Sequence, residues 1–278
     1  ILAIAWAGRL IFVGVFLYAG CGEGATGFAG IAGHVGLPLP GVWGFIACVI
    51  TLVGSFAILC GPAGVPLASV ASIVGCVSLF GFMLIATWFG HARLLSTAEG
   101  QARVTHTQHL MKNVSIMGGL VAVIGYDLPV LDTSPGPIPS ATLRPLHPHI
   151  LVGLGNVLLV SCIGGASLKS GIGGFTGIAK HFAYPAPAFM GVMAFLFTSL
   201  GSALVVIGQL ARLKIATLIG SKMCIVFMAI ATYSGHFKPL FSSEGEDKLW
   251  HERSVAKNAS IIGALIMVAA VSFHDLQI

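Results

Sequence analysis

Eight long apolar stretches constrain this chain more than any other feature of its sequence. They lie near residues 2–20, 42–61, 66–89, 112–131, 148–167, 188–208, 213–235 and 257–274. Each is long enough, or nearly so, to cross a hydrocarbon core about 30 Å thick as a helix. Gly125 and Pro129 fall inside the fourth stretch, where we expect an interruption. The pattern predicts eight transmembrane helices joined by loops, with Gly171–Gly174 in one of these loops.

The scarcity of charge excludes a soluble fold. Charged residues make up 8% of the 278 and mean hydropathy is +0.96, whereas soluble domains are roughly one quarter charged. The net charge of +5 comes from Lys and Arg scattered over the loops, with no basic run. We therefore expect an all-α integral membrane protein, with membrane lipids as partners and no nucleic acid.

A proline-rich segment divides the chain. Asp132–His149 contains five prolines, which forbid a continuous helix. We place the domain boundaries on either side of it. The prediction is a first four-helix repeat at 1–131, a linker at 132–147 and a second four-helix repeat at 148–278.

The two halves resemble each other in residues that hydrophobicity alone does not explain. Gly27–Gly61 aligns with Gly174–Gly208 at an offset of 147 without a gap, with 14 identities in 35 positions. A second block aligns at an offset of 145 and matches Thr, His, Lys and Asn residues. We interpret this self-similarity as a tandem duplication.

The even number of spans in each repeat sets the topology. The second repeat enters the membrane from the same side as the first, so the sequence predicts two parallel, superposable four-helix bundles. Nine Lys and Arg lie on the face of the odd-numbered loops and three on the other face. The positive-inside bias places the odd-numbered loops on the cytoplasmic or equivalent side.

Three features in each half carry a family resemblance. They are a Pro-x-Pro segment before the second helix, a histidine at the end of the third, and a Lys-Asn entry to the fourth followed by a glycine: Gly36–Pro40 and Tyr184–Pro187, His91 and His236, and Lys112-Asn113 with Gly118 and Lys257-Asn258 with Gly263. In these features the chain resembles the DoxX family of small four-helix membrane proteins, here in tandem. The resemblance implies a membrane partner of electron-transfer machinery, such as quinone-linked sulfur oxidation or oxidant defence.

Six histidines at repeat-matched positions are the main site candidates: His34, His91, His106, His181, His236 and His251. All lie on the odd-loop face, where each triplet is expected to converge at one end of its bundle. As a functional site they would bind a metal, a quinone carbonyl, a chlorophyll magnesium or a haem iron. The structural alternative is a hydrogen-bonded network tying helix ends to loops. The identity of any metal stays open.

The remaining site candidates are lysines and asparagines. Lys112 and Lys257 open the fourth and eighth spans, where they would either snorkel to the interface or meet an acid or lipid phosphate. Asn113 and Asn258 follow them and are expected to hydrogen-bond across helices. Lys222 lies inside the seventh span; it would contact a partner protein, a lipid or water, or snorkel from a helix that starts later.

No catalytic motif accompanies these residues. The sequence lacks H-E-x-x-H, GxSxG and P-loop patterns, and we identify no catalytic residue. We also expect none of the nine acids to pair inside a membrane helix, which counts against a proton-coupled transporter.

These observations favour a non-catalytic accessory subunit of a larger photosynthetic or respiratory membrane complex, with other membrane subunits as partners. Chlorophyll, quinone or lipid would be its bound ligands. The chain begins at Ile1, and a removed leader would suit an organelle membrane, thylakoid or mitochondrial inner. A quinone-linked redox subunit of DoxX type is the alternative function, followed by a small-molecule transporter.

Overall fold

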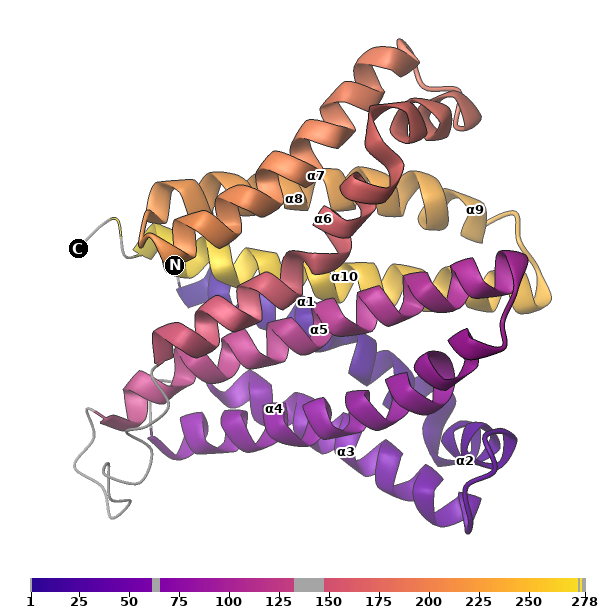
Figure 1. The fold of residues 1–278 in the computed structure, drawn as a ribbon. Coiled ribbons are helices and arrows are strands. Elements are labelled where there is room, and N and C mark those ends of the chain that lie inside the picture. Colours follow the sequence, from indigo (N-terminus) through magenta and orange to yellow (C-terminus); the bar gives the residue numbers. More distant parts are fainter. Residues whose placement is uncertain (1, 62–65, 133–147, 275, 277–278) are drawn as a thin grey trace.

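The computed structural model describes residues 2–61, 66–132, 148–274 and 276, and over these residues every regular element is a helix. The first half contains α1 (Leu2–Tyr18), η1 (Ala19–Glu23), α2 (Gly24–His34), α3 (Pro40–Cys60), α4 (Pro66–Thr87), η3 (Trp88–Ala92), η4 (Arg93–Ser96) and α5 (Gly100–Asp132). The second half contains α6 (Pro148–His181), α7 (Pro187–Leu210), α8 (Lys214–Thr232), η6 (Tyr233–Phe237), α9 (Lys238–Leu240) and α10 (Gly245–His274). The long helices run side by side (Figure 1).

The structure confirms the all-helical class and is consistent with an integral membrane protein. In the described part of the chain, seven helical segments are long and apolar enough to cross a membrane. The eighth long helix is α5, whose polar first turns precede the apolar stretch predicted at 112–131. The predicted linker lies, after Asp132, outside the described residues.

Two local predictions were wrong. We expected Pro129 to interrupt the fourth span, but α5 continues through it to Asp132. A proline removes one helical hydrogen bond, here the one from its own position to the Gly125 carbonyl, and the helix continues for three more residues after this loss. We expected loops after the first and fifth spans, but these glycine-rich segments are helical on both sides of a single non-helical glycine, Gly24 in the first half and Gly171 in the second.

A glycine kinks the first long helix of each half. Gly24 has φ 60° and ψ −172°, and Gly171 has φ 57° and ψ −173°. This region of backbone space is essentially restricted to glycine. Each kink redirects the chain, so that α2 packs against α3 and the last part of α6 packs against α7. The two kinked segments lie at the end of the molecule opposite the chain termini (Figure 1). We call the end with the two kinked segments the loop end, and the opposite end, where the chain termini lie, the terminal end.

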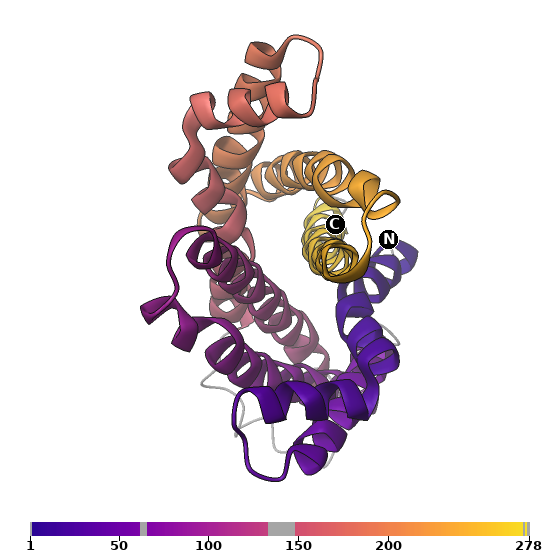
Figure 2. The same ribbon diagram turned by 90° about the vertical axis from the view of Figure 1, so that its right-hand side faces the viewer.

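The last helix of each half packs along the first helix of the other half. α5 lies against α6, and α10 lies against α1 (Figure 2). Both contacts depend on glycine. A Cβ at Gly118 would lie 2.4 Å from the Leu159 backbone nitrogen, and one at Gly263 would lie 2.4 Å from the Phe12 backbone nitrogen. Small residues of this kind allow helix backbones to approach closely in lipid.

Serines strengthen the same two contacts. Ser260 Oγ donates to the Phe12 carbonyl at 2.6 Å and accepts from the Val15 backbone N–H at 3.4 Å. Ser115 Oγ accepts from the Cys162 backbone N–H at 3.3 Å. The halves therefore interlock through α5 and α10, which also contact each other.

We predict that Gly263→Ala destabilises the protein by about 1–3 kcal/mol, the usual cost of overpacking. The added methyl group would meet backbone atoms of α1, including the Gly8 carbonyl oxygen at 2.7 Å, which cannot rotate away. Gly14→Ala is the matched control, because a Cβ there meets nothing within 4 Å. Thermal unfolding in detergent measures both variants; equal unfolding temperatures would contradict the close packing.

Candidate functional site

Two histidine pairs lie at matching places in the two halves. His91 Nδ1 faces His106 Nδ1 at 3.2 Å, and His236 Nδ1 faces His251 Nδ1 at 3.3 Å. Two ring nitrogens at this distance form a hydrogen bond only when one carries a proton and the other does not. Each pair therefore contains one donor and one acceptor ring, and ties the end of a third-span helix to the helix that follows it.

A π-helical turn places the first histidine of each pair. His91 belongs to η3 and His236 to η6, which continue α4 and α8 respectively. Such turns are rare and appear frequently at functional sites. Because the wider turn occurs in both halves, the same local distortion aims both histidines at their partners.

A third histidine, His109, joins the first-half pair and was missed by the sequence analysis. Its ring stacks on His91 with centroids 5.0 Å apart, and Lys257 Nζ lies 3.4 Å from His109 Nδ1. An ammonium group has no acceptor, so Lys257 donates to His109. The position 145 residues later is Ser254, so no repeat match pointed to His109.

Each of the two lysines lies close to histidines of the other half. Lys257 of the second half lies among first-half histidines. Lys112 of the first half lies within electrostatic range of His236 in the second half. From the sequence we expected an acid, a lipid phosphate or simple snorkelling at these lysines; the structure places Lys257 beside an imidazole. The exchange follows from the packing of α5 and α10 across the halves.

The two asparagines are buried next to the lysines in sequence. Asn113 Nδ2 donates to Thr87 Oγ1 at 3.0 Å, which links α5 to α4. The Oδ1 atoms of Asn113 and Asn258 find no hydrogen-bond donor among the described residues. The predicted cross-helix bond is thus present for Asn113.

The structure does not bring His34 and His181 into these clusters. Both are exposed at the last residues of α2 and α6, and neither forms a hydrogen bond among the described residues. The expected triplets are wrong in this respect, because the glycine kinks carry α2 and the end of α6 outward. In the described part of the chain, no group of three or more His, Cys, Asp or Glu could hold a metal ion.

A buried ion pair inside the first half overturns the expectation that no acid pairs within a membrane helix. Arg9 Nη1 donates to Asp127 Oδ2 at 2.9 Å, to Ser72 Oγ at 3.0 Å and to the Ile58 carbonyl at 3.0 Å. One guanidinium thus contacts α3, α4 and α5 from its own place on α1. The signal was present in the sequence, because Asp127 falls inside the apolar stretch 112–131.

The second half has neutral side chains at the matching positions. Asn156 stands 147 residues after Arg9 and Ser272 stands 145 residues after Asp127. Both are buried, and Asn156 Nδ2 lies 3.5 Å from Gln209 Oε1. The buried Arg9–Asp127 ion pair at the terminal end therefore has no charged counterpart at the matching positions of the second half.

Lys222 lies exposed on α8, without a hydrogen bond or ion pair to any described residue. Ile215, Ile219 and Val226 are exposed on the same helix at spacings of four, three and four residues around it. These spacings put all four side chains on one face. The helix begins at Lys214, so a later start does not explain this lysine.

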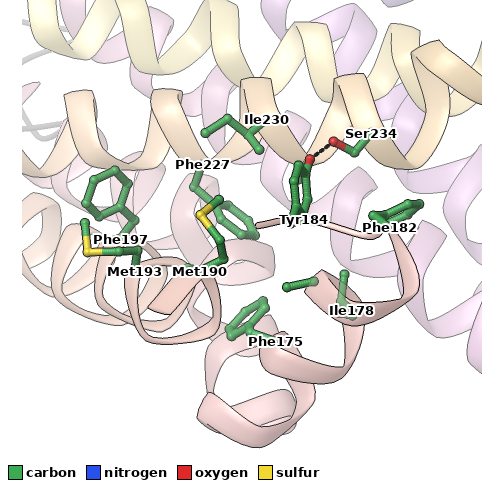
Figure 3. A pocket seen from close by; sticks show the side chains of 13 residues that line it. Phe175, Ile178, Phe182, Tyr184, Met190, Met193, Phe197, Phe227, Ile230 and Ser234 are labelled. Atoms are coloured by element: carbon green, nitrogen blue, oxygen red, sulfur yellow. Dashed lines mark hydrogen bonds between the residues drawn. The ribbon is translucent and has the colours of Figure 1, made fainter. Parts of the chain in front are cut away.

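Two apolar pockets occupy matching positions on the flanks. The first-half pocket, of ≈ 390 Å³, lies between α2, α3 and α4 and includes Phe28 and Phe82. The second-half pocket, of ≈ 190 Å³, lies between the end of α6, α7 and α8 and includes Phe175 and Phe227 (Figure 3). None of these four phenylalanines was predicted as a site residue, because apolar side chains are common throughout a membrane protein.

A hydroxyl pair distinguishes the second-half pocket. Tyr184 and Ser234 hydrogen-bond to each other beside the cavity (Figure 3). Burial raises the pKa of the Tyr184 hydroxyl, so this group stays protonated. The matching positions in the first half hold Leu37 and Phe89.

No family model, no curated protein and no solved structure matches this chain.

We predict that Arg9→Asn alone costs about 3–5 kcal/mol of stability, because it leaves the Asp127 carboxylate buried without its partner. Adding Asp127→Ser reproduces the neutral pair of the second half and should recover most of this loss. Unfolding of wild type, both single variants and the double variant in detergent gives the coupling energy. A double variant no more stable than Arg9→Asn would contradict the ion pair.

We further predict that His91→Gln with His106→Gln lowers stability by about 1 kcal/mol, the typical net value of one hydrogen bond. His236→Gln with His251→Gln should behave alike. His34→Gln with His181→Gln is the control and should change stability by no more than about 0.5 kcal/mol. Unchanged stability together with a lost redox or pigment absorption band would instead identify the pairs as ligands.

Proposed function

We propose that this protein is a non-catalytic integral-membrane subunit of a larger bioenergetic complex, photosynthetic or respiratory, and that it joins this complex through α8. The observation that carries the proposal is the outward position of Lys222. A lysine in the apolar part of a transmembrane helix is costly and almost always faces the bundle interior, water or a partner.

Geometry argues for a protein partner at this lysine. Lys222 follows the start of α8 by eight residues, which is about 12 Å of helix at 1.5 Å per residue. Its apolar neighbours Ile219 and Val226 are exposed on the same face. A neighbouring subunit that covers this stripe and offers a carboxylate would satisfy the charge. The matching first-half residue is Val77, so the docking face belongs to the second half.

The interior polar groups support a scaffold role. Most of the predicted site residues that contact another side chain connect two helical segments. His91 does this with His106, and Asn113 does it with Thr87. Arg253 pairs with Glu23, and Tyr18 donates to Glu252 at 2.9 Å, which clasps α10 to α1 and η1. These contacts hold helices together.

A tandem origin from a DoxX-like four-helix unit is part of the proposal. Its support is the recurrence of unusual features at the sequence offsets of 147 and 145. The kink glycines Gly24 and Gly171 recur in this way, as do the π-helical turns and the positive-φ residues Leu39 and Ala186. Rotation about an axis along the membrane normal would relate the halves.

A quinone-linked redox subunit is the second candidate. It is favoured by η6, where Ser234 lines the second-half pocket and His236 belongs to a histidine pair two residues later. An absorption spectrum of the purified protein separates the candidates, because a haem or flavin band would indicate redox chemistry.

We predict that Lys222→Leu leaves folding intact and reduces assembly. A tagged chain, extracted in mild detergent and run on a native gel, should migrate in a complex well above its own 28.7 kDa. The variant should shift toward the free protein, because the partner carboxylate loses its cation. Lys169→Leu is the control, since this lysine is exposed on α6 away from the α8 stripe. Equal assembly of both variants and wild type would refute docking through α8.

A further inference from the structure

The two flank pockets are built alike, which makes each a control for the other. In the first half, Phe28 and Phe82 pack edge to face with centroids 5.7 Å apart. In the second half, Phe175 and Phe227 do the same at 5.7 Å. Each pair joins the kinked segment to the third-span helix and lines its pocket. The cavities therefore come from the architecture and not from a chance gap in packing.

Close backbone contacts position the helices that form both pockets. A Cβ at Gly44 would lie 2.3 Å from the Ala25 carbonyl oxygen, and one at Gly191 would lie 2.7 Å from the Thr176 backbone nitrogen. These glycines hold α3 against α2, and α7 against the end of α6. A preformed apolar pocket of this kind is a common form of ligand site, since little ordering is needed on binding.

The hydroxyl pair of the second-half pocket has one proton to spare. Tyr184 and Ser234 together carry two hydroxyl protons, and their mutual hydrogen bond uses one. Neither hydroxyl forms another hydrogen bond among the described residues. The remaining proton can be donated to an acceptor in the cavity, whose other walls are apolar side chains such as Ile178 and Phe197.

We propose that the second-half pocket binds a membrane amphiphile by its apolar part and prefers one whose carbonyl oxygen, from an acyl ester or a quinone ring, accepts the free hydroxyl proton. The first-half pocket, with Leu37 and Phe89 in place of the hydroxyls, takes an apolar chain without this selectivity. A cavity of ≈ 190 Å³ holds a ring or part of a chain, and the remainder lies along the lipid-facing surface. The proposed pocket extends the lipid or quinone binding that the sequence led us to expect, and it does not depend on docking through α8.

The test uses the full chain in detergent and three probes of similar length: a decyl-substituted benzoquinone, methyl laurate and decylbenzene. Equilibrium dialysis measures the affinity for each. Tyr184→Phe with Ser234→Ala should weaken binding of at least one carbonyl probe roughly 3- to 10-fold, the effect of one hydrogen bond. It should leave decylbenzene binding unchanged. The unfolding temperature of the double variant checks that it folds.

Introducing the two hydroxyls into the first-half pocket provides a test that does not alter the second half. Leu37→Tyr with Phe89→Ser should create a second site with carbonyl preference. Tighter binding of the benzoquinone identifies a quinone as the natural class, and tighter binding of methyl laurate identifies an acyl lipid. Equal carbonyl affinities in wild type and the Tyr184→Phe, Ser234→Ala variant would overturn the selectivity. Failure of all three probes to bind would overturn the pocket as a ligand site, even if native gels show the chain in its complex.

Discussion

The close approach of α10 to α1, and of α5 to α6, is the contact on which the remaining structure depends. Lipid tails are as apolar as leucine, so no hydrophobic effect pulls these helices together. They meet because Gly263 and Gly118 present bare backbone to Phe12 and Leu159. This arrangement puts the two last helices at the centre of the molecule (Figure 2). It also carries Lys257 into the first half, where it reaches His109.

The sequence predicted the spans well because apolar length is a local property that lipid enforces residue by residue. It predicted His91, His106, His236 and His251 as a set because the same polar residues recur at a fixed offset of 145. The sequence could not show which helices pack across the halves, because a stripe of small residues allows close packing against any neighbouring helix and does not identify that neighbour. The glycine kinks were missed for a related reason: glycine-rich segments read as loops until φ and ψ are known.

Differences between the halves carry more functional information than their agreement. Matched positions such as Gly24 and Gly171 build the fold and are needed twice. The hydroxyls of Tyr184 and Ser234 and the outward Lys222 occur in the second half alone, opposite apolar residues in the first. Apolar residues at those places satisfy the fold, so packing does not require the polar ones. Polar groups retained where packing does not need them point to contacts with other molecules.

The first half keeps its own distinction at the terminal end, where Arg9 joins four helices through one side chain. Its Nη1 contacts the Ile58 carbonyl, Ser72 and Asp127, and a Cβ at Gly61 would lie 2.1 Å from it. The first half is thereby fastened at both ends, by this ion pair and by the histidine pair. Asn156 in the second half reaches Gln209 through a longer contact of 3.5 Å. The second half, which bears the proposed docking face and the hydroxyl-lined pocket, has its own histidine pair and a neutral contact in place of the ion pair. Breaking the Arg9–Asp127 pair would leave a buried charge in the first half, a constraint that the neutral residues of the second half do not impose.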